Sequence, residues 1–189
     1  RIYPTFTFNG GVNSSNDEVI FAVDDDLALT NNALSSSGSG KLQLTLVKQV
    51  TLTGGPNDNI LKASGWAGSV TLDGQGGEDL YMLDLGTLGS AIVADSGADA
   101  SERDDLTVLG SVGNDTITAN GTVVSVGAST IDVASSGVEM ISIAGMAGDD
   151  TFTIDSVTMG EISLDGLDGS DIYNLNVCGS PNTVVFVSD

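Results

Sequence analysis

Four short segments of the chain share one arrangement of glycine and aspartate. Each has the pattern Gly-x-x-Gly-x-Asp with an apolar side chain one or two positions later, and they are residues 74–79, 110–115, 145–150 and 166–171. Residues 54–59 and 94–99 carry weaker versions of the pattern. Glycine permits backbone angles that let several carbonyl groups converge on one point, and the closing carboxylate adds charge and further oxygens. Converging oxygens suit a hard cation such as Ca²⁺, which takes about 6–8 oxygen ligands.

A single turn supplies too few oxygens for such a shell, so we predict that two stacked turns complete it. The repeat spacing favours Asn59 with Asp79, and Asp150 with Asp171, as the best pairs. The predicted ligands are Asn59, Asp73, Asp79, Asp115, Asp149, Asp150, Asp165 and Asp171, with Glu78 and Asp168 as helpers. Aspartate is also an ordinary turn residue that bonds its own backbone, so one motif alone favours a plain turn. The recurrence of the motif in an acidic chain favours calcium.

These turns resemble the glycine- and aspartate-rich nonapeptide of the RTX, or hemolysin-type, calcium-binding repeats. Residues 110–118 and 145–153 fit its pattern G-G-x-G-x-D-x-U-x best, with Ile117 and Phe152 at the large apolar position U. The second glycine of that pattern is missing, and the motifs do not follow one another without interruption. The resemblance therefore covers the turns, where it implies calcium binding. The longer unit at residues 136–154 resembles long repetitive bacterial surface proteins.

The charge of the chain limits the partners that it can bind. Its 189 residues include 26 acidic and 5 basic ones, the formal net charge is −21, and no basic residue follows Arg103. A compact fold with this excess repels itself unless cations bind to it, and it offers no basic surface to nucleic acid or anionic membranes. Disorder is not expected, because 40% of the residues are hydrophobic and they form regular aliphatic clusters. The charge predicts a folded, cation-binding protein without nucleic-acid binding or membrane insertion.

The residue types leave little room for catalysis. The chain has no His and a single Cys, Cys178, which excludes Ser-His-Asp and Cys-His arrangements and an intrachain disulfide, and disfavours zinc. Residues 94–98 resemble the Asp-Ser/Thr-Gly-Ala turn of retroviral-type aspartic proteases, but Asp95 falls in phase with the repeat, at the position of Asp189 in the next copy. Almost every other acid lies in a turn motif, which argues against a carbohydrate-active enzyme. A non-enzymatic protein is expected.

The elements that position these turns repeat at two lengths. Residues 69–74 match residues 161–166, so the chain holds two copies of a unit of roughly 90 residues. Within each copy, apolar residues alternate with Thr or Ser in runs that Gly/Asp turns separate about every 20 residues. The longer gaps between turns are predicted to hide degenerate turns near Gly38 and Asp132.

A period near 20 residues is too short for an independent domain and suits one coil of a β-solenoid, in which each coil buries its inner face on its neighbours. We therefore predict an all-β fold that forms one continuous solenoid, similar to a β-helix or β-roll. Its first repeat unit covers residues 1–95 and its second covers residues 96–189. Two tandem Ig-like β-sandwiches are the alternative, because roughly 100 residues also suit that domain.

These patterns together predict a structural calcium-binding repeat module of an extracellular or cell-surface protein. The two ends of the chain lie near the same phase of the repeat, which predicts end-to-end self-association into fibres or arrays, or contact with neighbouring repeats of a longer chain. The alternatives are an adhesin module that binds a carbohydrate or protein, and a carbohydrate-active β-helix enzyme. No aromatic platform favours the adhesin, because Trp66 is the single tryptophan.

Overall fold

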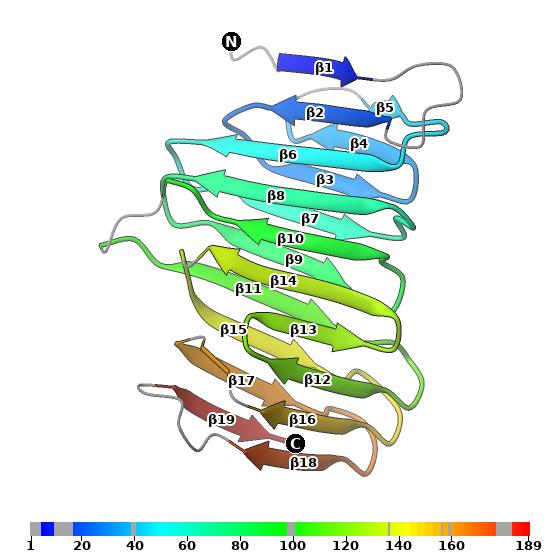
Figure 1. Cartoon of the computed structure of the whole chain (residues 1–189), viewed down its shortest axis with the longest axis vertical. Helices are drawn as coiled ribbons and strands as arrows, with labels where there is room; N and C mark the ends of the chain where they lie inside the picture. The colour runs from blue at the N-terminus through cyan, green and yellow to red at the C-terminus, as the bar shows by residue number, and fades with distance from the viewer. Residues whose placement is uncertain are drawn as a thin grey trace.

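The computed structural model describes residues 5–9, 17–38, 41–97, 101–135, 137–155, 157–158, 160–176 and 183–189. The regular structure in this part of the chain is β-strand throughout, arranged in two mixed sheets, so the predicted all-β class is confirmed. The strands lie across the long axis of the molecule and follow one another along it (Figure 1). No helix of the described residues has the length and apolar character that crossing a membrane requires.

The two sheets, called sheet A and sheet B, have ten and nine strands among the described residues. Sheet A contains, in spatial order, β1 (Thr5–Asn9), β2 (Glu18–Ala22), β6 (Gln49–Gly55), β8 (Ser69–Gln75), β10 (Ser90–Ala94), β14 (Ser129–Ser135), β13 (Val123–Val126), β12 (Thr116–Asn120), β16 (Thr151–Asp155) and β18 (Ile172–Asn176). Sheet B contains β19 (Val184–Ser188), β17 (Glu161–Asp165), β15 (Val138–Ala144), β11 (Asp104–Leu109), β9 (Leu80–Asp84), β7 (Ile60–Ser64), β3 (Leu27–Thr30), β4 (Ala33–Ser36) and β5 (Lys41–Gln43).

Over most of its length the chain alternates between the sheets, so that neighbours within a sheet are parallel. The pairs β6–β8 and β8–β10 in sheet A, and β7–β9 and β9–β11 in sheet B, are examples. Burial follows the alternation of each strand: Val70 and Leu72 in β8 are buried, whereas Thr71 between them is partly exposed. Phe152 and Ile154 in β16 are buried in the same way, as their sequence pattern predicts. One hydrophobic cluster contains these residues from both sheets.

Two antiparallel excursions interrupt the alternation. In sheet B the chain runs through β3, β4 and β5, and in sheet A through β12, β13 and β14. Gly38 follows β4 in a turn, but the predicted degenerate turn near Asp132 is wrong, because Asp132 lies inside β14. The glycines that reverse the chain around β13 are Gly121 and Gly127, whose φ angles are 62° and 59°. The long gaps in turn spacing therefore contain two additional strands rather than a weakened turn.

The two repeat copies occupy opposite sheets. Strand β8 of the first copy lies in sheet A, whereas its sequence match β17 in the second copy lies in sheet B. Each copy, β2 to β10 and β11 to β19, has an odd number of strands, so the second copy begins in the other sheet. The Gly/Asp turns of the first copy therefore lead from sheet A to sheet B on one side of the molecule, and those of the second copy lead from sheet B to sheet A on the opposite side (Figure 1). The predicted boundary between residues 95 and 96 falls just after β10.

Candidate metal centre

The closing residues of the Gly-x-x-Gly-x-Asp turns form two ladders of hydrogen bonds, one on each of the two sides of the molecule where strands end and turns connect the sheets. In the first ladder, the Asn59 N–H donates to Asp79 Oδ1 at 2.7 Å, and the Asp79 N–H donates to Asp104 Oδ1 at 2.7 Å. Both residues of the predicted pair, Asn59 and Asp79, are thus neighbours on successive rungs. The turn at residues 94–99, predicted to follow them, extends outside the described residues.

The second ladder has the same construction on the opposite side of the molecule. The Asp115 N–H donates to Asp150 Oδ1 at 2.7 Å, and the Asp150 N–H donates to Asp171 Oδ1 at 2.8 Å. The predicted pair of Asp150 and Asp171 is therefore also adjacent. In both ladders one carboxylate oxygen faces a backbone N–H of the preceding rung, which satisfies a donor that the turn leaves unpaired.

The first glycine of each motif makes room for the carboxylate that closes it. A Cβ atom on Gly74 would lie 1.9 Å from Asp79 Oδ2, and one on Gly145 would lie 2.2 Å from Asp150 Oδ2. The second glycine has a positive φ in three of the four turns, with values of 103° at Gly77, 128° at Gly148 and 152° at Gly169. The motif thus has two separate steric requirements, of which the sequence reasoning recognised only the backbone angle.

The other predicted ligands are hydrogen-bonded within the turns rather than gathered at one point. Asp73 accepts from the backbone and hydroxyl of Ser96 at 3.0 and 2.8 Å. Asp115 accepts from the Ser111 backbone at 2.6 Å and from its hydroxyl at 3.0 Å. Asp149 Oδ1 accepts from the Ser170 N–H at 3.1 Å, and Asp165 Oδ1 accepts from the Leu167 N–H at 3.3 Å. Of the two helpers, Glu78 donates its N–H to Asp58 and Asp168 donates its N–H to Met146, and both side chains are exposed.

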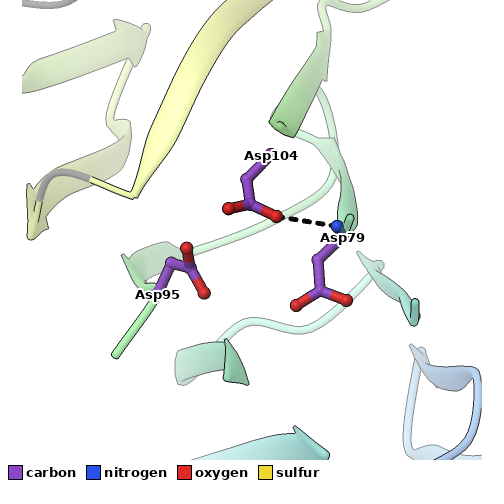
Figure 2. A group of neighbouring side chains, drawn as sticks. All are labelled: Asp79, Asp95 and Asp104. Atoms are coloured by element: carbon purple, nitrogen blue, oxygen red, sulfur yellow. Dashed lines mark hydrogen bonds between the residues drawn. The ribbon is translucent and has the colours of Figure 1, made fainter. Parts of the chain in front are cut away.

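Three aspartates converge where the two repeat copies meet. Asp79 closes the turn after β8, Asp95 follows β10, and Asp104 begins β11; Figure 2 shows their side chains grouped around one point. A carboxylate oxygen from each lies within 4.8 Å of the other two, and the residues are 2%, 5% and 1% exposed. This cluster, here called the Asp triad, is the single group of three potential metal-ligating side chains that the described residues bring so close.

The described structure thus has a defined candidate site. Comparison with protein-family models, curated proteins and solved structures finds no match to this chain. The chemistry of the Asp triad must therefore be argued from its own atoms. Two of its carboxylate oxygens, Asp79 Oδ2 and Asp95 Oδ2, are buried and have no hydrogen-bond partner. An oxygen in that condition is costly to bury unless a proton or a cation neutralises it.

A tyrosine connects the Asp triad to the glycine turn. The Tyr81 hydroxyl accepts from the Gly74 N–H at 2.8 Å and donates to Asp95 Oδ1 at 3.3 Å. Tyr81 is fully buried in β9, and burial, followed by the negative charge of Asp95, raises its pKa. The hydroxyl therefore stays protonated and remains a donor to Asp95 at any physiological pH.

The electrostatics of the Asp triad favour a positive partner. Burial raises the pKa of Asp79 to about 6, with a smaller contribution from the charge of Asp104. Burial, followed by a side-chain hydrogen bond with Asp104 and then by its charge, raises the pKa of Asp95 to about 8. Among the described residues, the recorded ion pairs join Arg103 to Asp105 and to Glu161, so neither neutralises the Asp triad. Near neutral pH the cluster either retains protons or binds a cation. Three carboxylates suit a hard cation with oxygen ligands, so the Asp triad could hold a metal ion.

Sequence reasoning identified Asp79 as a ligand but missed the other two members of the Asp triad. Asp95 was noticed only for its likeness to a protease turn, and Asp104 was not singled out. A usable signal exists for Asp104, because Leu106 and Val108 are the buried positions of β11 and strand alternation places Asp104 on the same inner face. A charged residue on an inner face is rarely there without a partner.

Proposed function

We propose that this chain is a non-enzymatic, structural β-solenoid module that a divalent cation, Ca²⁺, stabilises where its two repeat copies meet. The observation that carries the proposal is the Asp triad, in which three buried carboxylates lie within 4.8 Å and two of their oxygens have no partner. Asp79, Asp95 and Asp104 would hold the ion, and Tyr81 would orient Asp95 toward it. Of these residues, Asp79 is among the ligands expected from sequence, and Asp95 and Asp104 join it.

The strand connections support a solenoid over a pair of Ig-like sandwiches. Ig-like domains are built from antiparallel strands with Greek-key connections. Here the chain passes from sheet to sheet, and successive strands of one sheet run parallel, as in β6–β8–β10 and β15–β17–β19. The spacing of the ladder residues, 20 positions between Asn59 and Asp79 and 21 between Asp150 and Asp171, agrees with one coil.

The burial of the Asp triad supports a structural rather than a catalytic role. Each of its residues is at most 5% exposed, so a polysaccharide or peptide substrate has no path to the carboxylates. Calcium is favoured over zinc by the all-oxygen ligand set, and over magnesium because Mg²⁺ demands near-octahedral geometry and keeps several of its waters. A site of this kind would be filled at the roughly millimolar calcium levels at which extracellular modules bind the ion. That agrees with the proposed extracellular or cell-surface location.

Thermal unfolding of the full chain in Ca²⁺, Mg²⁺ and EDTA at pH 7.5 tests the proposal. An ion that binds only the folded state, present at about 100 times its Kd, adds about 2.7 kcal/mol of stability. For a chain of this length that corresponds to a rise of roughly 5–10 °C in Tm. We expect Ca²⁺ to produce such a rise and Asp104→Asn to abolish it.

Asp168→Asn is the matched control, because it removes the same charge from an exposed turn position outside the Asp triad. That variant should keep the full calcium-dependent rise. Identical Tm values in Ca²⁺ and EDTA for the unmodified chain would refute the cation site. A rise that survives Asp104→Asn would place the ion elsewhere in the molecule.

A further inference from the structure

The C-terminal end of the stack repeats the surroundings of the Asp triad. Tyr173 in β18 is the match of Tyr81, and its hydroxyl accepts from the Gly166 N–H at 2.9 Å as that of Tyr81 accepts from Gly74. Asp171 is the match of Asp79: its Oδ1 accepts from the preceding rung, and its Oδ2 is buried without a partner. The second copy therefore rebuilds the turn, the tyrosine and the first carboxylate of the site.

The second carboxylate is present as well. Val93 of β10 pairs with Leu72, and Val187 of β19 pairs with Leu164, so β10 and β19 hold equivalent positions on β8 and β17. Asp95 and Asp189 are the second residues after these two valines. The charge of Asp189 also raises the pKa of Tyr173, after the larger effect of burial, as Asp95 does for Tyr81. The Tyr173 hydroxyl donates to the Ser188 carbonyl at 2.8 Å, whereas the Tyr81 hydroxyl donates to Asp95.

The third carboxylate is what the C-terminal end lacks. The Asp79 N–H donates to Asp104, whereas the part of the chain that the structure describes offers no acceptor for the Asp171 N–H. Inside the molecule, β11 covers β9 and β14 covers β10, but no described strand covers the outer edges of β18 and β19. Leu83 and Val93 are 0% exposed as a result, while the equivalent Leu175 and Val187 are 44% and 46% exposed.

The N-terminal end of the stack carries the matching strands. In the first copy β2 corresponds to β11, because Glu18 pairs with Gln49 as Asp105 pairs with Met140. In the same way β5 corresponds to β14, since each is the last strand of its antiparallel excursion. Asp17, one position before Glu18, is therefore the counterpart of Asp104.

The two ends of the stack complement each other in charge, and each ends in outer strands that can pair further. The N-terminal end presents the exposed Lys41 on β5, which is the last strand of sheet B there, while the C-terminal end carries Asp171 and Asp189 and no basic residue. The outer edge of β2 is occupied by β1, which pairs with it in the antiparallel direction. A strand added to β18 in the manner of β11 therefore requires β1 to leave β2.

We propose that the C-terminal end of this chain, β18 and β19, binds the N-terminal end of a second copy of this chain. In this head-to-tail contact, β5 of the second copy pairs with β19. Strand β1 of the second copy leaves β2, and the freed edge of β2 pairs with β18. Asp17 of the second copy then supplies a third carboxylate beside those of Asp171 and Asp189. The contact repeats the junction between the two copies within one molecule. Its cation dependence rests on the proposed function, because an ion that bridges three ionised carboxylates offsets their mutual repulsion.

Sedimentation velocity of the full chain over a hundredfold range of concentration, in Ca²⁺ and in EDTA, tests the proposal. We expect dimers and longer species that grow with concentration, and more of them in Ca²⁺. Val187→Asp places a charge on the exposed inner face of β19 and should weaken the dimer at least tenfold. Ile92→Asp is the matched control, because Ile92 is 44% exposed in the middle of the stack and should leave association unchanged.

Asp17→Asn separates this contact from the proposed internal site. It should remove the calcium dependence of association while leaving the calcium-induced rise in Tm intact, since the Asp triad does not contain it. A chain that stays monomeric in both solutions, or a Val187→Asp variant that associates like the unmodified chain, would overturn the docking surface. Equal association in Ca²⁺ and EDTA would overturn the role of Asp17. If the unmodified chain associates as expected but shows no calcium-induced rise in Tm, the internal cation site is refuted and the contact is not.

Discussion

Tyr81 is the residue on which the glycine turn and the Asp triad both depend. Its hydroxyl satisfies the Gly74 N–H and donates to Asp95, and the side chain is fully buried. We predict that Tyr81→Phe destabilises the fold by about 1–3 kcal/mol, because it leaves a buried N–H without an acceptor. Urea denaturation at pH 7 measures the loss. Tyr173→Phe removes the equivalent bond to Gly166 at a partly exposed position, so its cost should be smaller; equal costs would contradict this account.

A methyl group on the first glycine of a turn provides a second test at the scale of a residue. The Cβ of Gly74→Ala would lie 1.9 Å from Asp79 Oδ2 and 2.6 Å from the Tyr81 hydroxyl, so the carboxylate and the ring must both shift. We predict a loss of about 1–3 kcal/mol from overpacking, measured by chemical denaturation. Gly76→Ala is the control in the same turn, since its nearest contact is an ordinary 3.7 Å. A neutral Gly74→Ala would show that the turn is loosely packed.

The residue scale also shows where sequence reasoning stops. The motif itself predicted that Asp79 and Asp171 lie on turns with acidic neighbours, because glycine and aspartate spacing is a local property. It could not predict that Asp104 reaches Asp79, since the two residues are separated by a strand in the other sheet and a connection of irregular length. Which carboxylates meet depends on the path of the chain between turns, and the motif contains no information on that path.

At the scale of the elements, the ladders explain why both aspartate and asparagine close these turns. Asn59 and Asp115, the first closing residues of the two ladders, each accept a bond within their own turn, from the Gly55 N–H at 2.8 Å and from the Ser111 N–H at 2.6 Å. The later aspartates each supply one acceptor oxygen for the N–H of the preceding rung. The second oxygen of Asp150 is buried without a partner, and burial raises the pKa of this carboxyl. The negative charge is therefore not what the ladder requires.

This difference gives a prediction for Asp150 in the second ladder. Asp150→Asn keeps the acceptor for the Asp115 N–H and removes a buried charge, so stability at pH 8 should be unchanged or higher. Asp150→Ala removes the acceptor as well and should cost about 1–3 kcal/mol. Thermal unfolding of both variants in EDTA measures the contrast. A large loss for the asparagine variant in EDTA would show that the carboxylate itself, and not only its acceptor oxygen, stabilises the ladder.

The strands themselves were largely predictable, and their assignment to sheets was not. Alternation of apolar residues with Thr and Ser marked β8, β16 and β17, because an inner face buried on neighbouring strands imposes a period of two. The exchange of sheets between the two copies follows from the odd number of strands in each. That number was hidden from sequence reasoning, because the excursion through β12, β13 and β14 was interpreted as a weakened turn around Asp132.

At the scale of the whole molecule, the basic residues that could neutralise the acidic charge are unevenly distributed along the chain. The basic residues end at Arg103, which pairs with Asp105 and Glu161, so the second copy has no cation of its own beyond that point. Among the described residues, the Asp triad at the junction of the copies is the close group of carboxylates, and Asp171 and Asp189 hold the equivalent positions at the C-terminal end. Both are also places where one copy ends, so cation binding and the joining of units are expected to depend on each other.

The dependence of stability on pH tests that link for the entire fold. In the folded state the pKa of Asp79 is about 6 and that of Asp95 about 8, both above the unfolded value of about 3.9. Folding therefore favours the protonated carboxyls, so their contribution is complete below about pH 4 and is lost as the pH rises through 6 and 8. In EDTA, Tm should fall between pH 5 and pH 8.5. In Ca²⁺ the fall should be smaller, and the gain from Ca²⁺ should grow with pH, because the ion binds the ionised carboxylates.

General repulsion in so acidic a chain also lowers stability as the pH rises, and a pair of double variants separates the two causes. Asp79→Asn with Asp95→Asn removes the two raised pKa values, so the slope of Tm against pH in EDTA should flatten and the calcium effect should vanish. Glu78→Gln with Asp168→Asn removes the same number of charges from exposed positions and should keep both the slope and the calcium effect. If the two double variants have the same slope, repulsion alone governs the pH dependence and the Asp triad does not, which would leave the buried carboxylates without a role in joining the copies.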